Sequence, residues 1–326
     1  LDNGYATQDD VDCTESFGFL PGADPKDVSD KAVKRGFDQI GTLGSGNHFL
    51  EIQVVEEGNI FDKEKAEIMG INKVGQICLM IHCGSRGFGH QIATDYMRQF
   101  LEVMPKYGIE VLDRELACAP MNSPEGKAYY SAMACAANMA FANRQVIMHR
   151  VREVFKEVFG DSTEIKLVYD VAHNIAKLEK HIVDGVEKEL IVHRKGATRA
   201  FGPSRFADLP KKYASIGQPV ILPGSMETGS YLLVGSDKAD QETFASTAHG
   251  AGRVMSRSAA IKKFDGVQLQ KSMLKKGIYV HGVSMKGLAE EAGGAYKDIE
   301  SVAQSLHDIG ITKKVVKFMP IGNIKG

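Results

Sequence analysis

Four of the ten histidines lie in short stretches rich in glycine and small polar residues: His48, His82, His173 and His249. An isolated histidine is usually a surface residue or a hydrogen-bonded structural one. Four in similar settings favour one shared site, because neutral imidazole is a good ligand for Mn, Zn, Fe or Ni. Their wide spacing along the chain matches no local zinc motif, so the fold must assemble any such site. The other six histidines are interpreted as structural: His90, His149, His181, His193, His281 and His307.

Basic residues accompany these histidines and indicate phosphate binding, because the planar guanidinium of arginine binds phosphate through two parallel hydrogen bonds. Arg253 and Arg257 follow His249 at helical spacing. This predicts that both lie on one face of a helix beginning near Gly252, whose N-terminal N–H groups could bind an anion. Further basic residues stand close to the other glycine-rich stretches: Arg86, Arg194, Lys195 and Arg199.

Several common catalytic motifs are absent, which narrows the chemistry. The sequence has no Walker A loop, no Gly-x-Gly-x-x-Gly fingerprint with an acidic partner and no His-Glu-x-x-His. Gly46-Asn47-His48 is similar to the Gly-Asn-His of metallophosphoesterases, but Phe49 stands where they have an acidic residue. Their other histidine motifs are missing too, so a phosphoesterase is the weaker alternative.

The composition is that of an ordinary globular protein, with 43% hydrophobic and 25% charged residues. Forty basic and 41 acidic residues nearly cancel, so any nucleic-acid contact requires a local basic patch. No apolar run could span a membrane, and no signal peptide opens the sequence. Five cysteines without a Cys-x-x-Cys pair favour reduced thiols and a cytoplasmic location. Because the sequence opens with Leu1 in what resembles the middle of a helix, we expect that an N-terminal portion is absent.

The elements that must position these residues are predicted from hydrophobic patterns and capping signals. Asp24 and Pro25 predict a short helix to about Lys34, and Ser123-Pro124-Glu125 predicts a long helix to about Phe159. Shorter helices are expected at 92–103, 253–263, 267–275 and 296–308. Buried strands are expected at 49–55, 76–82, 165–171, 190–192, 220–222 and 231–234. Strands and helices mix without regular alternation, which predicts an α+β fold. Six of the connecting loops combine glycine with polar residues, as functional loops on a rigid scaffold often do.

Seven motifs in these loops and at the C-terminus resemble the RtcB family of tRNA-splicing ligases. The resemblance covers essentially the whole chain and keeps the order of the family's motifs. The motifs are LGSGNHFLEIQ, MIHCGSRGFGHQIATDYM, YDVAHNIAK, VHRKGATRAFGP, PGSMETGSY, STAHGAGRVMSR and PIGNIKG. The resemblance implies one catalytic domain over residues 1–326, with mixed sheets and a metal cleft formed by strand-end loops.

The resemblance also assigns roles to residues of this sequence. His249 corresponds to the histidine that attacks GTP and becomes guanylated. His48, His82 and His173 correspond to ligands of a two-manganese centre. The positions that correspond to guanine-nucleotide contacts are Asn47, His48, Phe49, Leu50, Glu51, His173, Asn174, Pro223, Gly224, Ser225, Met226, Ser230, Gly250, Ala251, Gly252, Tyr296 and Lys325. Those that correspond to contacts with RNA phosphates are Arg35, Arg86, Arg253 and Arg257.

The implied reaction joins an RNA 3′-phosphate or 2′,3′-cyclic phosphate to a 5′-hydroxyl, in tRNA splicing or RNA repair. It depends on GTP and Mn²⁺, and in some lineages an activator protein called archease assists turnover. A neutral imidazole nucleophile splits a difficult transfer into two easier steps.

One family motif, Asp-Val-Asn-Cys-Gly-Val-Arg, does not occur in this sequence. It supplies an aspartate and a bridging cysteine to the metals. Asp10-Val11-Asp12-Cys13 is only superficially similar, so Cys13 is interpreted as structural. We therefore expect weak metal binding and poor ligation from the 326 residues alone, and recovery when the missing segment is added. A non-catalytic module that binds RNA or GTP is a second alternative, and a requirement for GTP separates all three hypotheses.

Overall fold

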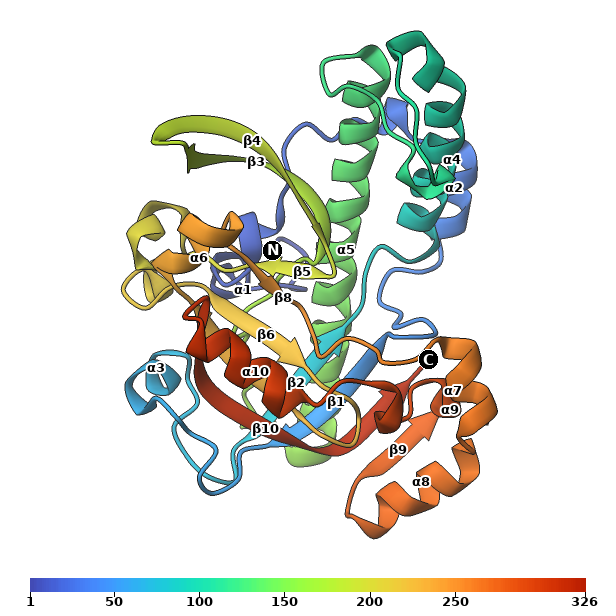
Figure 1. The fold of residues 1–326 in the computed structure, drawn as a ribbon. Coiled ribbons are helices and arrows are strands. Elements are labelled where there is room, and N and C mark those ends of the chain that lie inside the picture. The colour runs from blue at the N-terminus through green and yellow to red at the C-terminus, as the bar shows by residue number, and fades with distance from the viewer. The chain divides into compact units, whose positions relative to one another are not determined.

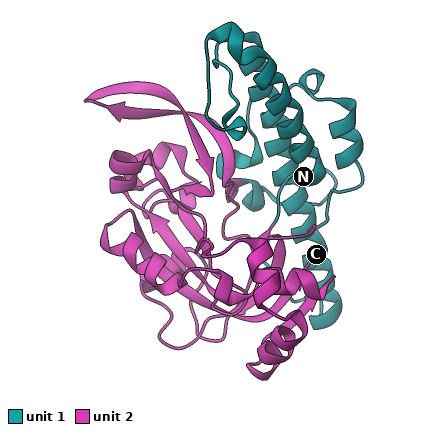
Figure 2. Cartoon of the chain, turned by 45° about the vertical axis from the view of Figure 1, so that its right-hand side comes forward, with its two compact units in different colours: residues 1–11, 15–42, 83–165 teal, residues 12–14, 43–82, 166–326 magenta.

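The computed structural model describes residues 1–326 (Figure 1). The chain divides into two compact units, each built from separate stretches of sequence (Figure 2). Unit 1 comprises Leu1–Val11, Glu15–Thr42 and Cys83–Ile165, and unit 2 comprises Asp12–Thr14, Leu43–His82 and Lys166–Gly326. Helices make up unit 1, and unit 2 contains every strand, which confirms the α+β prediction. The single domain over residues 1–326 stays a prediction. No helix is both long enough and apolar enough to cross a membrane.

Unit 1 is built around α5, Pro124–Phe159, the longest helix. Its predicted start is confirmed, because the Ser123 hydroxyl accepts a hydrogen bond from the Gly126 N–H and Pro124 occupies the first turn. Ala132 of this helix packs with Ile92 and Phe100 in one apolar cluster. The other helices of unit 1 are α1 Gln8–Asp12, α2 Asp30–Gly36 and α4 Arg86–Val103, with 3-10 turns at Glu15–Gly18, Pro25–Asp27, Met104–Tyr107 and Arg114–Leu116.

The predicted helix from Pro25 to Lys34 is two elements. Asp24 caps only the 3-10 turn Pro25–Asp27, and the chain is extended at Val28. Ser29 then caps α2 by accepting a hydrogen bond from the Ala32 N–H. A second N-cap residue, Ser29, thus starts a separate helix after the 3-10 turn.

Asn143, which is 0% exposed, joins α5 to two loops within unit 1. Its side-chain oxygen accepts from the N–H of Gly41 at 2.6 Å, and its amide donates to the carbonyl oxygens of Thr42 and Gly84 at 3.3 and 3.0 Å. Removing the amide leaves several partly buried backbone groups unsatisfied, each at a cost of about 1 kcal/mol or more.

We therefore expect Asn143→Ala to lower the free energy of unfolding by about 3 kcal/mol. Glu157→Ala, an exposed change on the same helix, should have an effect below about 0.5 kcal/mol. Urea unfolding of the two variants measures both values. Equal stabilities would show that Asn143 does not fix these loops.

Unit 2 contains a mixed six-stranded sheet in the order β2-β1-β10-β7-β6, with β9 pairing with β10. Strand β10, Thr312–Lys325, is long enough to pair with β1, β7 and β9, the last in parallel. Leu232, Val234 and Val316 contribute to one buried cluster beside this sheet. The remaining strands of the sheet are β1 Phe49–Val54, β2 Ile77–His82, β6 Pro219–Pro223, β7 Ser230–Gly235 and β9 Tyr279–Gly282.

Two further strand pairs complete unit 2. Strands β3, Asn174–Val183, and β4, Val186–Lys195, form a long twisted ribbon (Figure 1). It turns at Asp184-Gly185, both with positive φ, as a tight hairpin requires. Strands β5 Ala197–Arg199 and β8 Ser246–Ala248 form the other pair. The helices of unit 2 are α3 Lys63–Ile68, α6 Asp237–Thr243, α7 Arg257–Lys263, α8 Gly266–Lys275, α9 Met285–Glu290 and α10 Ile299–Asp308, with 3-10 turns at Pro203–Asp208, Lys211–Tyr213 and Gly293–Ala295.

Two further predicted elements differ from the structure. Residues 165–171 are apolar because they pack into the core, with Tyr169 3% exposed, but Asp170 makes only an isolated bridge to Thr14. The helix predicted from Arg253 begins at Arg257, after an N-cap at Ser256. In residues 165–171 the apolar pattern therefore records burial without specifying a backbone partner.

Candidate active site

Unit 2 brings the four strand-end histidines together. His82 ends β2 and is paired with Phe49 of β1, so His48 lies at the same end of the sheet. The Nε2 atoms of His82 and His173 are 2.9 Å apart. The ring centres of His48 and His82 are 6.0 Å apart, and the His173 ring stacks on that of His249 at 4.4 Å.

The strand pair β5–β8 positions His249. Ala197 pairs with Ala248, so the next residues along the two strands, Gly196 and His249, face each other. Gly196 has φ +66°, and a Cβ atom there would lie 3.5 Å from the His249 ring. That distance is an ordinary contact, so the left-handed backbone conformation, and not the space beside the ring, is what favours glycine here.

Burial favours the neutral form of His82 and His249. It lowers the pKa of His82 well below the usual value, and the neighbouring His173, His48 and His249 lower it further. Burial also lowers the pKa of His249, although a hydrogen bond from its ring to the Gly196 backbone acts in the opposite direction. Neutral imidazole is the form that binds metals and attacks phosphorus.

The donor chemistry of the cluster fits a borderline metal ion. Two nitrogen ligands at right angles, each about 2.1 Å from one ion, lie roughly 3 Å apart. The His82 and His173 nitrogens have this separation. No three His, Cys, Asp or Glu side chains converge on one point in this conformation, so the third ligand would have to turn inward. Cys13 is 6% exposed and belongs to an apolar core cluster that contains none of these histidines.

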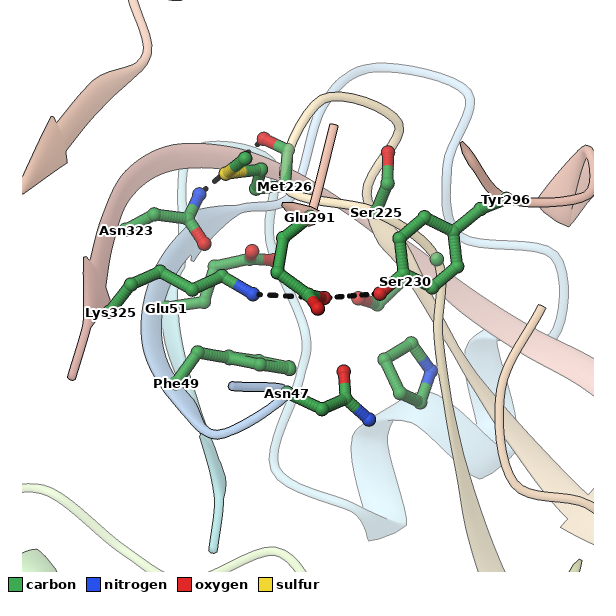
Figure 3. Close-up of a pocket in the computed structure, with 12 residues that line it drawn as sticks. Asn47, Phe49, Glu51, Ser225, Met226, Ser230, Glu291, Tyr296, Asn323 and Lys325 are labelled. Carbon is green, nitrogen blue, oxygen red and sulfur yellow. Dashed lines mark hydrogen bonds and ion pairs between the residues drawn. The ribbon is translucent and has the colours of Figure 1, made fainter. Parts of the chain in front are cut away.

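A pocket lies at the same end of the sheet (Figure 3). Ten of its residues were assigned to the nucleotide from the sequence: Asn47, Phe49, Glu51, Pro223, Gly224, Ser225, Met226, Ser230, Tyr296 and Lys325. Two were not, Glu291 and Asn323. The pocket adjoins the histidines, because the Phe49 ring centre is 5.3 Å from that of His82 and the Ala251 N–H donates to the Pro223 carbonyl at 3.0 Å.

Glu51 is one of two buried acids of this pocket, 3% exposed. Burial raises its pKa to about 7, although Gln53, Lys325 and Asn323 act in the opposite direction. The Gln53 amide donates to Glu51 at 2.5 Å and to the Ser230 hydroxyl at 3.0 Å, which fixes the carboxylate. Strand periodicity could have placed Gln53 beside Glu51, because positions 51 and 53 share one face of β1. Asn323 faces Glu51 in the register of β1 and β10, a pairing that the sequence did not reveal.

A second buried carboxylate, Glu291, lies across the pocket near Lys325. The Lys325 ammonium is 5.1 Å from the Phe49 ring centre and 3.7 Å from the Glu291 carboxylate. Burial lowers the Lys325 pKa, and the two glutamates oppose this. The Tyr296 hydroxyl donates a hydrogen bond to Glu291. Burial raises the pKa of Tyr296.

The arginine pair after His249 is not on one helix face, which corrects the sequence prediction. Arg253 forms a β-bridge with Tyr296 and donates to its hydroxyl at 3.0 Å. Arg257 is the first residue of α7 and pairs with Glu290 at 3.1 Å. The extended backbone arises because Val254 and Gly252 hydrogen-bond to residues 295 and 297.

The other assigned residues occupy varied positions. Leu50 is buried in β1, Asn174 is exposed at the start of β3, and Gly250 and Gly252 lie in the loop after β8. In unit 1, Arg35 donates to Gln91 at 2.9 Å, and Arg86 begins α4 with φ +54°.

The sequence matches the model of one protein family, described as tRNA-splicing ligase RtcB, over residues 1–326. The chain is 53% identical over 329 residues to tRNA-splicing ligase RtcB of Methanococcus maripaludis, and covers 68% of that protein. It is 50% identical to the protein of the same name from Thermococcus kodakarensis, covering 67% of it, and 51% identical to that from Pyrococcus abyssi, covering 36%. All of this chain is aligned in each case. The chain therefore belongs to the tRNA-splicing ligase RtcB family.

Proposed function

We propose that this protein is a GTP- and Mn²⁺-dependent RNA ligase that joins 3′-phosphate or 2′,3′-cyclic phosphate ends to 5′-hydroxyl ends through a guanylated His249. The relatives are named tRNA-splicing ligases, which favours exon ends of tRNA as substrates. The observation that carries the proposal is the contact between a buried acidic pocket and a cluster of neutral histidines, made through Phe49 and through the Ala251–Pro223 hydrogen bond.

The pocket has the chemistry to select guanine. Guanine presents two neighbouring donors, N1–H and the 2-amino group, and an ionised Glu51 accepts both. Adenine presents an acceptor at N1, which would face the carboxylate and leave it unpaired. A buried site built for hydrogen bonds rejects the wrong partner by roughly 100-fold or more. Lys325 supplies N–H donors to the same pocket.

In the first chemical step, a ring nitrogen of neutral His249 attacks the α-phosphorus of GTP. The bond to the β-phosphate oxygen breaks, pyrophosphate leaves, and the imidazole loses a proton. A 3′-phosphate oxygen of RNA then attacks the same phosphorus, which frees His249 and leaves a pyrophosphate linkage on the RNA. The 5′-hydroxyl of the second RNA attacks the RNA phosphorus, and GMP departs. Each step thus has a better leaving group than direct displacement from a 3′-phosphate.

His48, His82 and His173 would hold the manganese. Bound manganese supplies positive charge that stabilises the phosphates during transfer. Arg35, Arg86, Arg253 and Arg257 are proposed to contact RNA phosphates. The Arg257 side chain is 60% exposed and is the more accessible of the pair that follows His249.

Comparison of GTP with ATP tests the guanine assignment. Equilibrium binding to the chain in Mn²⁺ should favour GTP by about 100-fold or more. Equal affinities would contradict the proposal. A phosphoesterase would instead release phosphate from a simple ester without any nucleotide, and a binding module would retain RNA without GTP-dependent joining.

A further inference from the structure

Glu291 stands at the centre of a polar network in the pocket wall. Its side chain is 2% exposed and follows α9. It accepts a hydrogen bond from the Tyr296 hydroxyl and one from the Arg253 guanidinium at 3.3 Å, and lies 3.7 Å from the Lys325 ammonium. Figure 3 shows the carboxylate between Lys325 and Tyr296. A carboxylate with three such partners at the edge of a pocket has a fixed orientation.

Two buried carboxylates of the pocket share one lysine. The ion pair of Lys325 is with Glu291, whereas Glu51 acts on it only through Coulomb attraction at longer range. Lysine has a flexible four-carbon side chain and a compact charge, so it moves readily to the nearest anion. Loss of the Glu291 charge would leave Glu51 as the remaining buried anion for Lys325. Glu51 would then be occupied by the lysine and less able to accept hydrogen bonds from a base.

We propose that Glu291 is a positioning residue for nucleotide selection, which holds Lys325 away from Glu51 and directs its ammonium to the keto oxygen of guanine. This rests on the proposed guanine site. Lys325 has three N–H donors, and Glu291 engages its head group while leaving a donor for the base. The amino group of adenine at the same position is itself a donor and would meet the ammonium unfavourably. Glu291 therefore supports both acceptance of guanine and rejection of adenine.

The test compares Glu291→Gln with Glu290→Gln. Both remove one negative charge from adjacent residues, but Glu290 pairs with Arg257 and does not line the pocket. The measurement is the ratio of the dissociation constants of ATP and GTP. We expect Glu291→Gln to reduce this ratio by about tenfold, and Glu290→Gln to leave it unchanged.

A double-mutant cycle separates positioning from a structural role. If Glu291 acts through Lys325, then Glu291→Gln has no further effect on the ratio in a Lys325→Met background. Additive effects would overturn the proposal, as would an unchanged ratio in Glu291→Gln. Thermal unfolding checks each variant, and Glu291→Asp replaces Glu291→Gln in the cycle if the latter does not fold. A wild-type chain without preference for GTP would overturn the guanine site itself, whereas a retained preference in Glu291→Gln overturns only the role of Glu291.

Discussion

Replacement of His249 by alanine is expected to reduce GTP-dependent RNA joining by about 10⁴-fold or more, because the attacking nitrogen is lost. GTP affinity should change only a few-fold, since the base pocket is formed by other residues. His249 lies half-buried in a loop after β8, so the fold should persist. Joining is measured with a 3′-phosphate oligonucleotide and a 5′-hydroxyl partner.

His193→Ala is the matched control, because His193 is exposed in β4 and outside the cluster. It should join RNA at the wild-type rate. The experiment uses the 326-residue chain and the same chain extended by a relative's N-terminal segment that contains the Asp-Val-Asn-Cys-Gly-Val-Arg motif. RNA joining by His249→Ala at a rate near wild type would move the nucleophile elsewhere.

Replacement of Glu51 by glutamine is expected to weaken GTP binding and to stabilise the free protein. Burial raises the folded-state pKa of Glu51 from 4.5 to about 7. A group whose folded pKa is raised contributes stability below about pH 4.5 and loses it as pH rises through 7. The ionised side chain therefore costs roughly 3 kcal/mol at pH 8, which glutamine removes. Such a cost is typical of a carboxylate held ready for a ligand.

Ionisation of Glu51 makes both GTP affinity and protein stability depend on pH. Wild-type affinity for GTP should increase from pH 6 to pH 8, as Glu51 ionises and becomes an acceptor for two donors. Glu51→Gln should bind GTP weakly with little dependence on pH, and should unfold at a higher temperature than wild type at pH 8 but not at pH 4.5. Glu56→Gln, an exposed change just after the same strand, should alter neither property. A less stable Glu51→Gln at pH 8 would contradict this interpretation.

The sequence predicted the strand-end positions of the histidines because β1 and β2 are short, apolar and bounded by glycine. Their three-dimensional proximity depends on registers such as Phe49 with His82 and Ala197 with Ala248, which no local pattern encodes. Arg253 illustrates the limit, because its helical spacing from Arg257 is overridden by a backbone bridge to Tyr296.

The sequence analysis missed two pocket residues, Glu291 and Asn323, for physical reasons. Glu290 and Glu291 are adjacent acids in the sequence, yet one pairs with Arg257 at the surface and the other is buried. Asn323 lies in β10, a strand that the terminal motif did not suggest. Burial of a charged side chain is decided by tertiary packing, and sequence alone gives it no distinct signal.

The most direct test of the central claim is the mass and location of a covalent guanylate. The protein, in the two forms described above, is incubated with GTP and Mn²⁺, digested, and its peptides are analysed by mass spectrometry under alkaline conditions. We predict one added guanylate on the peptide that contains His249, stable in alkali, lost in acid, and absent with ATP. A guanylate on another residue, or none in either form, would contradict the proposed mechanism.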